Sequence, residues 1–264
     1  MIQGSFMHVT GIGPVTDRLI RDSGFETWDD CLLRGEKLPL SVKRKNRFLG
    51  EIGKSKSAHD KNDLKYLLSR FHSREHWRIL AEYMEKATFF DIETTGLSWH
   101  YCHASVIAAL HKGRILTFMY GRNIDGFLDI LDEAELLVTF NGSSFDLPFI
   151  EKTFNIPPVG IPHIDLRWVA FHQGYTGGLK SIERQIGISR PREVRDIDGF
   201  EAVDLFHRWQ AGESGAGADL ARYCRTDAVC TYILARRLLE ENGSIPGSID
   251  ENALFMEAME WTEE

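Results

Sequence analysis

The sequence contains no long hydrophobic run and few cysteines, and these two features exclude several classes of protein. No apolar stretch in the 264 residues approaches the roughly 20 residues that a membrane-spanning helix needs, so no membrane association is expected. The first ten residues, MIQGSFMHVT, lack the basic start and apolar core of a secretory signal. Four cysteines without a CxxC spacing argue against a disulfide framework or a zinc ribbon. We therefore expect a cytoplasmic protein with reduced thiols.

Positive charge is also in deficit, except in one segment. The chain has 31 Lys and Arg against 39 Asp and Glu, a net charge of −8, with the 43% of hydrophobic residues that is typical of a soluble globular protein. Residues 34–86 nevertheless carry +7, whereas residues 87–264 carry −12. Such a basic segment can be a phosphate-binding surface, and it can equally be the solvated surface of Lys-rich helices.

The N-terminal third has helical patterns. Pro14 follows a Gly11-Ile12-Gly13 turn at a position that favours the start of a helix, and a second short helix is predicted before residue 35. Residues 36–86 combine a helical pattern of apolar positions with the excess of basic side chains. This part of the chain is predicted to be a small α-helical region.

From residue 87 onward the pattern changes to strands. The predicted strands are ATFFDIETT, SVIAAL, RILTFMYG, ELLVTF and PHIDL, with the second and third joined as a hairpin. A helical pattern precedes ELLVTF, and further helices are expected at 179–187, 199–210 and 218–241. A hairpin followed by strand–helix alternation predicts an α/β fold with a mixed five-stranded sheet flanked by helices.

Carboxylates lie on or directly after three of these predicted elements. Asp91 and Glu93 lie two apart on the first strand, so both side chains leave the same face of the sheet, and two acids on an apolar strand resist burial unless a cation offsets their charge. Asp146 follows the strand ELLVTF, where it can line a strand-end crevice, cap a helix, or do both. Tyr223 and Asp227 lie four apart on one face of the last long helix.

Together these segments resemble the three motifs of the DEDD exonucleases of the RNase H-like superfamily. The first motif matches FFDIETTGL, the second TFNGSSFDLPFI, and the third YCRTD in its tyrosine (DEDDy) form. The histidine form would place a His at position 222, where this chain has Arg222. The stretch HIDLRWVAFHQGYTGGLKSIERQIGI is similar to the predicted exonuclease branch called YprB-like. The resemblance covers about residues 87–242.

The resemblance implies an RNase H-like domain that hydrolyses phosphodiester bonds as a metal-dependent 3′–5′ exonuclease with two divalent ions. The implied metal ligands are Asp91, Glu93, Asp146 and Asp227, and oxygen ligands suit Mg²⁺ or Mn²⁺ better than zinc. Tyr223, with an ordinary pKa of about 10, is a poor general base at neutral pH and is expected to orient the attacking water.

Nucleic acid is the expected partner. The Gly11–Pro14 segment resembles half of a helix–hairpin–helix motif, whose turn amides bind the nucleic-acid backbone; it can equally be a helical hairpin that packs on the body or on a protein partner. This resemblance favours DNA over RNA and a role in DNA repair. The predicted nucleic-acid contacts are Gly11, Gly13, Thr94, Thr95, Gly96, Leu97, Asn141, Phe145 and Lys180, and for Lys180 a solvated role stays open.

Four segments follow from these patterns. We predict a helix–hairpin–helix-like segment at 1–35, a basic helical connector at 36–86, an RNase H-like exonuclease domain at 87–245 and an acidic C-terminal tail at 246–264. The stretch ENALFMEAMEWTEE in this tail can also be a loosely docked helix. Two alternatives to an exonuclease remain: a structure-specific endonuclease, because the same fold hosts both modes of attack, and a non-catalytic nucleic-acid-binding scaffold. The complete set of acids argues against the scaffold.

Overall fold

The computed structural model describes residues 1–244 and 249–261, and the chain forms two compact units. The first unit comprises Met1–Met84 and the second Glu85–Glu264. By sequence the first unit has a net charge of +4 and the second a net charge of −12. No helix in the described ranges is both long enough and apolar enough to cross a membrane.

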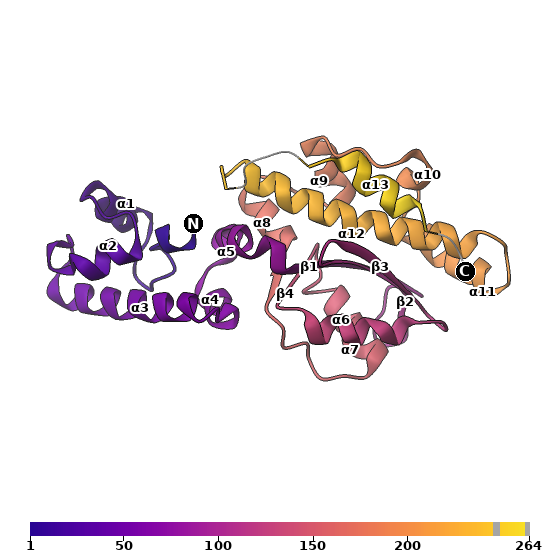
Figure 1. Ribbon diagram of the computed structural model, residues 1–264, viewed down its shortest axis with the longest axis horizontal. Coiled ribbons are helices and arrows are strands. Elements are labelled where there is room, and N and C mark those ends of the chain that lie inside the picture. The colour runs from indigo at the N-terminus through magenta and orange to yellow at the C-terminus, as the bar shows by residue number, and fades with distance from the viewer. Residues whose placement is uncertain (245–248, 262–264) are drawn as a thin grey trace. The chain divides into compact units, whose positions relative to one another are not determined.

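The first unit is helical. Its α-helices are α1 (Pro14–Asp22), α2 (Trp28–Leu33), α3 (Val42–Asp60), α4 (Leu64–Arg70) and α5 (His76–Tyr83), with 3₁₀ turns at Ile2–Gly4, Gly35–Lys37 and Ser73–Glu75 (Figure 1). Pro14 begins α1 directly after Gly13, and Gly11 has a φ of 90°, which favours glycine. A capping box between Thr27 and Asp30 begins α2. The two short helices predicted before residue 35 are confirmed.

An aromatic core holds the helices of the first unit together. Phe6, Trp28 and Phe48 are fully buried there. His8 stacks on Phe71 with ring centroids 4.5 Å apart. Burial lowers the pKa of His8 to about 4, so at neutral pH the ring is uncharged and packs as an aromatic side chain.

The second unit contains a five-stranded mixed sheet in the order β3-β2-β1-β4-β5. Its strands are β1 (Ala87–Thr94), β2 (Ala104–His111), β3 (Arg114–Met119), β4 (Leu136–Thr139) and β5 (His163–Asp165). Strand β2 pairs antiparallel with both β1 and β3, whereas β4 pairs parallel with both β1 and β5. All five predicted strands and the mixed sheet are confirmed.

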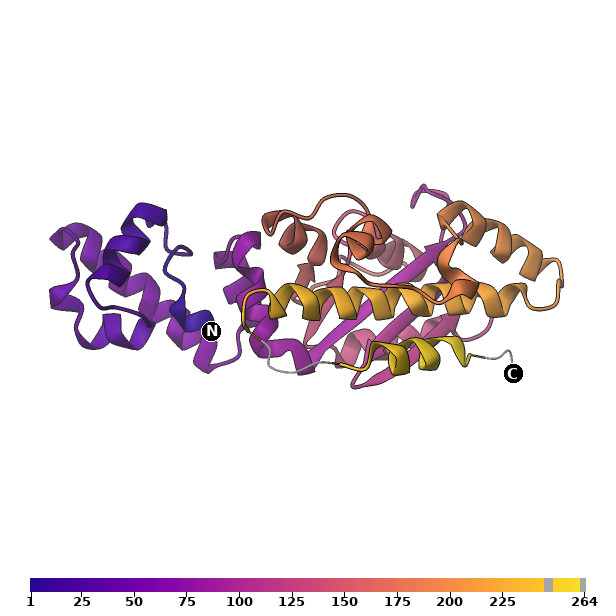
Figure 2. The ribbon, with the colours of Figure 1, turned by 90° about the horizontal axis from the view of Figure 1, so that it is seen from above.

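Helices cover both faces of this sheet. They are α6 (Phe127–Glu133), α7 (Asp146–Phe154), α8 (Leu166–His172), α9 (Leu179–Ile186), α10 (Arg192–Arg195), α11 (Gly199–Gln210), α12 (Ala216–Glu240) and α13 (Glu251–Met259), with 3₁₀ turns at Met84–Lys86 and Ile124–Gly126. In Figure 1, α12 lies on one side of the sheet and α6 and α7 lie on the other. Figure 2 shows α12 crossing the strands, with α13 beside it.

Successive side chains of β1 point to opposite faces of the sheet, and this determines which of them face α12. Phe90 and Ile92 pack in the cluster that contains α6 and α7. Phe89 points the other way and contacts Tyr232 of α12, with ring centroids 5.1 Å apart. Asp91 and Glu93 have the same parity as Phe89 and therefore face α12.

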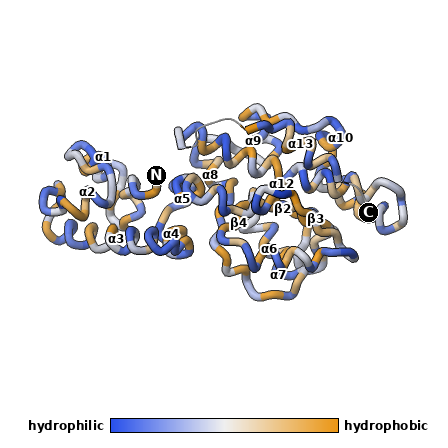
Figure 3. Tube along the Cα trace, viewed as in Figure 1, coloured by the Kyte–Doolittle hydropathy of each residue, from blue (hydrophilic) through white to orange (hydrophobic). Residues whose placement is uncertain are grey.

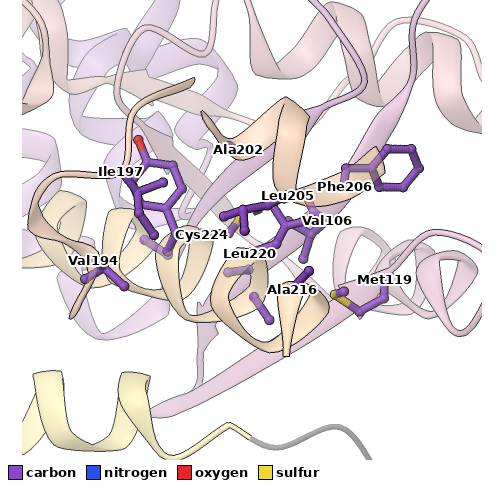
Figure 4. Close-up of a cluster of buried hydrophobic side chains, with 14 residues drawn as sticks. Val106, Met119, Val194, Ile197, Ala202, Leu205, Phe206, Ala216, Leu220 and Cys224 are labelled. Atoms are coloured by element: carbon purple, nitrogen blue, oxygen red, sulfur yellow. Dashed lines mark hydrogen bonds between the residues drawn. The ribbon is translucent and has the colours of Figure 1, made fainter. Parts of the chain in front are cut away.

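The core on the α12 side is apolar around these acids. Val106 of β2 packs with Leu205 of α11 and Leu220 of α12 (Figure 4), and Ala108 of β2 belongs to the same cluster. Ala108 and Val106 are also the β2 partners of Asp91 and Glu93. In Figure 3 the strands of the sheet are coloured mainly as hydrophobic. The two acids therefore lie on an otherwise apolar face.

The segment predicted as an acidic tail contains the helix α13. Residues 246–248 and 262–264 of that segment lie outside the described residues. Arg225 of α12 donates hydrogen bonds to the carbonyl oxygens of Ala258 (2.8 Å) and Glu257 (2.6 Å), and Trp261 packs against the α11–α12 cluster. α13 is thus a docked helix. The sequence analysis missed α8 and α10, which have only seven and four residues.

Candidate active site

Three carboxylates converge where β1 meets α12. Asp91 and Glu93 reach the site from β1, and Asp227 reaches it from the middle of α12. One oxygen of each of the three carboxylates lies within 4.8 Å of the others. The structure therefore brings together one pair of acids that is close in sequence and one acid that is 134 residues away.

The charge of Asp146, which belongs to another element, acts on two of these three carboxylates. It is the first residue of α7, follows the loop after β4, and is buried. It does not belong to the group of three oxygens within 4.8 Å, but its charge raises the pKa of both Asp91 and Glu93. The N-cap residue of α7 is Phe145, and no side chain caps this end of the helix, so the predicted capping role of Asp146 is wrong. The position beside the acid cluster is the one that its sequence context also allowed.

Burial raises the pKa of all four acids, and repulsion within the cluster adds to this effect at Asp91 and Glu93, whereas Arg190 opposes it at Asp227. Burial, followed by the charges of the other acids, raises the pKa of Asp91 and Glu93 well above the ordinary range. Burial raises the pKa of Asp146 to about 8 and also raises that of Asp227.

The acid cluster fits a divalent cation. Its donors are all carboxylate oxygens, which Mg²⁺ and Mn²⁺ prefer, and a cation would offset the repulsion between them. Asp227 Oδ1 is buried and forms no well-aligned hydrogen bond with any described residue, although Arg190 forms an ion pair with it.

Tyr223 lies one helical turn before Asp227 and lines the same pocket. The pocket has a volume of about 300 Å³, and the side chains around it include Asp91, Phe140, Lys180, Arg190, Tyr223 and Asp227. Burial and the charge of Asp227 raise the pKa of Tyr223 far above neutrality. Its hydroxyl therefore keeps its proton at neutral pH and can donate a hydrogen bond. This agrees with the expectation that Tyr223 is a poor general base.

Two cations flank the ring of Tyr223. Lys180 Nζ lies 4.9 Å from the ring centroid, and the Arg190 guanidinium carbon lies 6.0 Å from it. Lys180 also donates to the carbonyl oxygen of Ile197, and burial lowers its pKa. The structure thus places Lys180 in the pocket rather than on an open helix surface.

Arg190 is a site residue that the sequence analysis missed. Its guanidinium donates to both carboxylate oxygens of Glu183, at 2.7 and 2.5 Å, and forms an ion pair with Asp227. The sequence gives only a glutamate in a predicted helix and an arginine seven residues later.

Asp165 of β5 holds the loop after β4. Its carboxylate accepts hydrogen bonds from the Asn141 N–H (2.8 Å), the Ser143 N–H (3.2 Å) and the Ser143 hydroxyl (2.7 Å). Asn141 has a φ of 68°, a left-handed conformation, and its side-chain oxygen accepts from Arg167 (2.6 Å). A polar network therefore shapes the loop that leads to Asp146.

The other predicted nucleic-acid contacts differ in their surroundings. Thr94 is buried, Thr95 and Gly96 are partly buried, and Leu97 is 73% exposed. Phe145 packs against Phe149, with ring centroids 4.8 Å apart, at the edge of the α6–α7 core. Gly11 and Gly13 lie in the first unit, before α1. Of the contacts predicted on the β1 loop, Leu97 offers the largest free surface.

Comparison with known proteins assigns this fold to a family. A mixed sheet flanked by helices, with clustered carboxylates on its central strand, is the arrangement of RNase H-like domains. A family model described as the RNase_H superfamily matches residues 88–239. The chain belongs to the RNase_H superfamily. The RNase H-like fold class predicted from the sequence is therefore confirmed.

One solved structure and the curated proteins complete the comparison. The family B DNA polymerase from the hyperthermophilic archaeon Pyrobaculum calidifontis is 20% identical, with a TM-score of 0.48. The match covers 58% of this chain and 24% of the polymerase chain. None of the curated proteins matches the chain significantly.

Proposed function

We propose that this protein is a metal-dependent 3′–5′ exonuclease of the tyrosine (DEDDy) type, in the YprB-like branch, that hydrolyses phosphodiester bonds of nucleic acid. Membership of the RNase_H superfamily supports a nuclease that acts on nucleic acid. The observation that carries the proposal is the convergence of Asp91, Glu93 and Asp227 within 4.8 Å, with Tyr223 lining the same pocket.

The four acids would hold divalent ions, Mg²⁺ or Mn²⁺. Asp91, Glu93 and Asp227 would hold one ion, and Asp146 together with Asp91 would hold a second. When bound, such ions acidify water and offset the negative charge that develops on the phosphate. The apolar surroundings of β1 limit the screening of these charges by solvent.

The chain's own side chains would position the substrate. Tyr223 keeps its proton, so it would donate a hydrogen bond to the attacking water or to the phosphate and would not act as a base. Lys180 would contribute positive charge beside Tyr223. Asn141, held by Asp165 and Arg167, and the exposed Leu97 would contact the nucleotides next to the cleaved bond.

The first unit would bind the nucleic-acid backbone, with DNA favoured over RNA. Its net charge is +4, and it presents exposed Lys43, Arg44 and Arg47 on α3. Arg44 donates to the Gly11 carbonyl oxygen (3.0 Å), which puts a guanidinium beside the proposed helix–hairpin–helix turn. Asp17, an acid near this turn, is paired with Arg21 at 2.9 Å.

The experiment that tests the activity uses substrates labelled at either end. Purified protein is incubated with single- and double-stranded DNA and RNA in Mg²⁺, Mn²⁺ or chelator. We expect products that shorten stepwise from the 3′ end, only when metal is present. Asp91→Asn should abolish them, whereas Asp204→Asn, which changes an exposed acid on α11, should not.

The other outcomes identify the alternatives. Internal fragments that form before end shortening would indicate a structure-specific endonuclease. Binding without cleavage in any metal would indicate a scaffold. Equal cleavage of RNA and DNA would remove the preference for DNA.

A further inference from the structure

Arg190 is a buried arginine shared between two acids. Its side chain is 4% exposed and belongs to the connection between α9 and α10. It makes two hydrogen bonds to Glu183, at 2.7 and 2.5 Å, and an ion pair with Asp227. A guanidinium can make such planar, forked contacts with carboxylates, and a lysine ammonium cannot.

The contact with Glu183 alone would pair the charge of Arg190. Glu183 is itself buried on α9 and accepts hydrogen bonds from two of the guanidinium nitrogens. The ion pair with Asp227 is additional, and it links α9 to the middle of α12. Because Arg190 is anchored from the α9 side, it restrains the rotation of the Asp227 carboxylate.

This restraint acts on a residue of the acid cluster. Asp227 supplies one of the three oxygens that lie within 4.8 Å of one another, together with Asp91 and Glu93. A carboxylate held by one oxygen has a restricted set of orientations for the other. Residues that hydrogen-bond a metal ligand in this way orient it, and their loss typically weakens metal binding by about 10–100-fold.

We propose that Arg190 is a positioning residue of the metal site, which holds Asp227 toward Asp91 and Glu93 and thereby strengthens the binding of a divalent ion. The inference rests on the proposed function only in requiring that the acid cluster binds such an ion. A competing explanation is that Arg190 substitutes for a cation in the metal-free protein. In that case its removal would tighten metal binding.

Direct measurement of Mn²⁺ binding to the full chain tests the proposal. Calorimetry or electron paramagnetic resonance would compare the unchanged protein with Arg190→Gln and Arg190→Lys. We expect Arg190→Gln to raise the Kd for Mn²⁺ about 10–100-fold. Arg190→Lys keeps the positive charge but cannot make two parallel hydrogen bonds to one carboxylate. Its affinity for Mn²⁺ should therefore lie between those of Arg190→Gln and the unchanged protein.

A second buried arginine provides the matched control. Arg225 also lies in the core of the second unit, but it donates to Thr117 Oγ1 (2.9 Å) and to the carbonyl oxygens of Ile115, Glu257 and Ala258. Arg225→Gln should therefore lower the melting temperature in chelator without changing the Kd for Mn²⁺. A purely structural role of Arg190 predicts the same result for Arg190→Gln.

The outcomes separate this proposal from the nuclease assignment. Unchanged or tighter Mn²⁺ binding by Arg190→Gln, or full affinity in Arg190→Lys, would overturn the positioning role. If Arg190→Gln does not fold, the Mn²⁺ affinity of Arg190→Lys decides whether Arg190 is a positioning residue. If the unchanged protein binds Mn²⁺ in an Arg190-dependent manner but cleaves no substrate, the nuclease proposal fails and the role of Arg190 stands. If the unchanged protein binds no Mn²⁺, both fail.

Discussion

Replacement of Asp146 by asparagine should stabilise the metal-free protein at neutral and alkaline pH. Burial raises the pKa of the Asp146 carboxyl from 3.8 to about 8, so the folded protein retains a proton there that the unfolded chain has released above pH 4. Between these two values the folded state binds more protons than the unfolded state, and the free energy of unfolding decreases as the pH rises. Asparagine is uncharged throughout this range and removes the decrease.

The magnitude follows from the difference in pKa. One pKa unit corresponds to about 1.4 kcal/mol, so the change from 3.8 to about 8 sets an upper limit of about 6 kcal/mol at pH 8. Backbone hydrogen bonds that favour the charged form, including one from Ile92, reduce the effect. We expect Asp146→Asn to gain about 2–4 kcal/mol at pH 8, or about 5–15 °C in melting temperature, and under about 1 kcal/mol at pH 5.

The assay is urea or thermal unfolding in chelator at pH 5, 6, 7 and 8. The stability difference between Asp146→Asn and the unchanged protein should grow with pH. Added Mn²⁺ should stabilise the unchanged protein more than the variant, and nuclease activity should be lost in the variant. A lower melting temperature of the variant at pH 8, or a difference independent of pH, would show that Asp146 is mainly structural and would refute the reasoning.

Three further changes have defined outcomes. Tyr223→Phe should lower kcat by at most about 10²–10⁴-fold with an unchanged Kd for Mn²⁺, because it removes a hydroxyl but no metal ligand; full activity would exclude its role. Asp165→Asn should cost about 2–3 kcal/mol in urea unfolding, since it weakens the hydrogen bonds to Asn141 and Ser143, and unchanged stability would contradict this. A fragment of residues 85–264 should keep kcat but show a higher KM and a weaker dependence of nucleic-acid affinity on salt; if it is soluble with both unchanged, the first unit has no binding role.

The sequence was sufficient to predict the elements that carry the acids. Strict alternation on β1 places Asp91 and Glu93 on one face, and a spacing of four places Tyr223 and Asp227 on one face of α12. These regularities are local and follow from backbone geometry. That the two faces meet could not be derived from periodicity alone, and it entered the prediction through the resemblance to known motifs.

The contacts that hold the acids in place could not be derived from the sequence, because they join separate elements. Glu183 and Arg190 are seven residues apart on either side of the end of α9, where Gly187 has a φ of 79°. Their side chains can meet only because the chain reverses there. For Asp165 the strand was predicted, but its hydrogen bond from the Asn141 N–H depends on how β5 lies beside β4.

The distribution of charge explains how an acidic domain can receive a phosphodiester. The second unit carries −12, which repels nucleic acid at long range, but at physiological ionic strength this field is screened within about 8 Å of exposed charges. The pocket that Asp91 and Asp227 line also contains Lys180, whose Nζ lies 4.9 Å from the centroid of the Tyr223 ring, whereas Arg190 is paired with Glu183 and Asp227. Attraction over longer distances has to come from another source, and the +4 of the first unit has the required sign. Capture by the first unit and placement of the phosphate by Lys180, both as proposed above, would depend on different cations, so substitutions can test them separately.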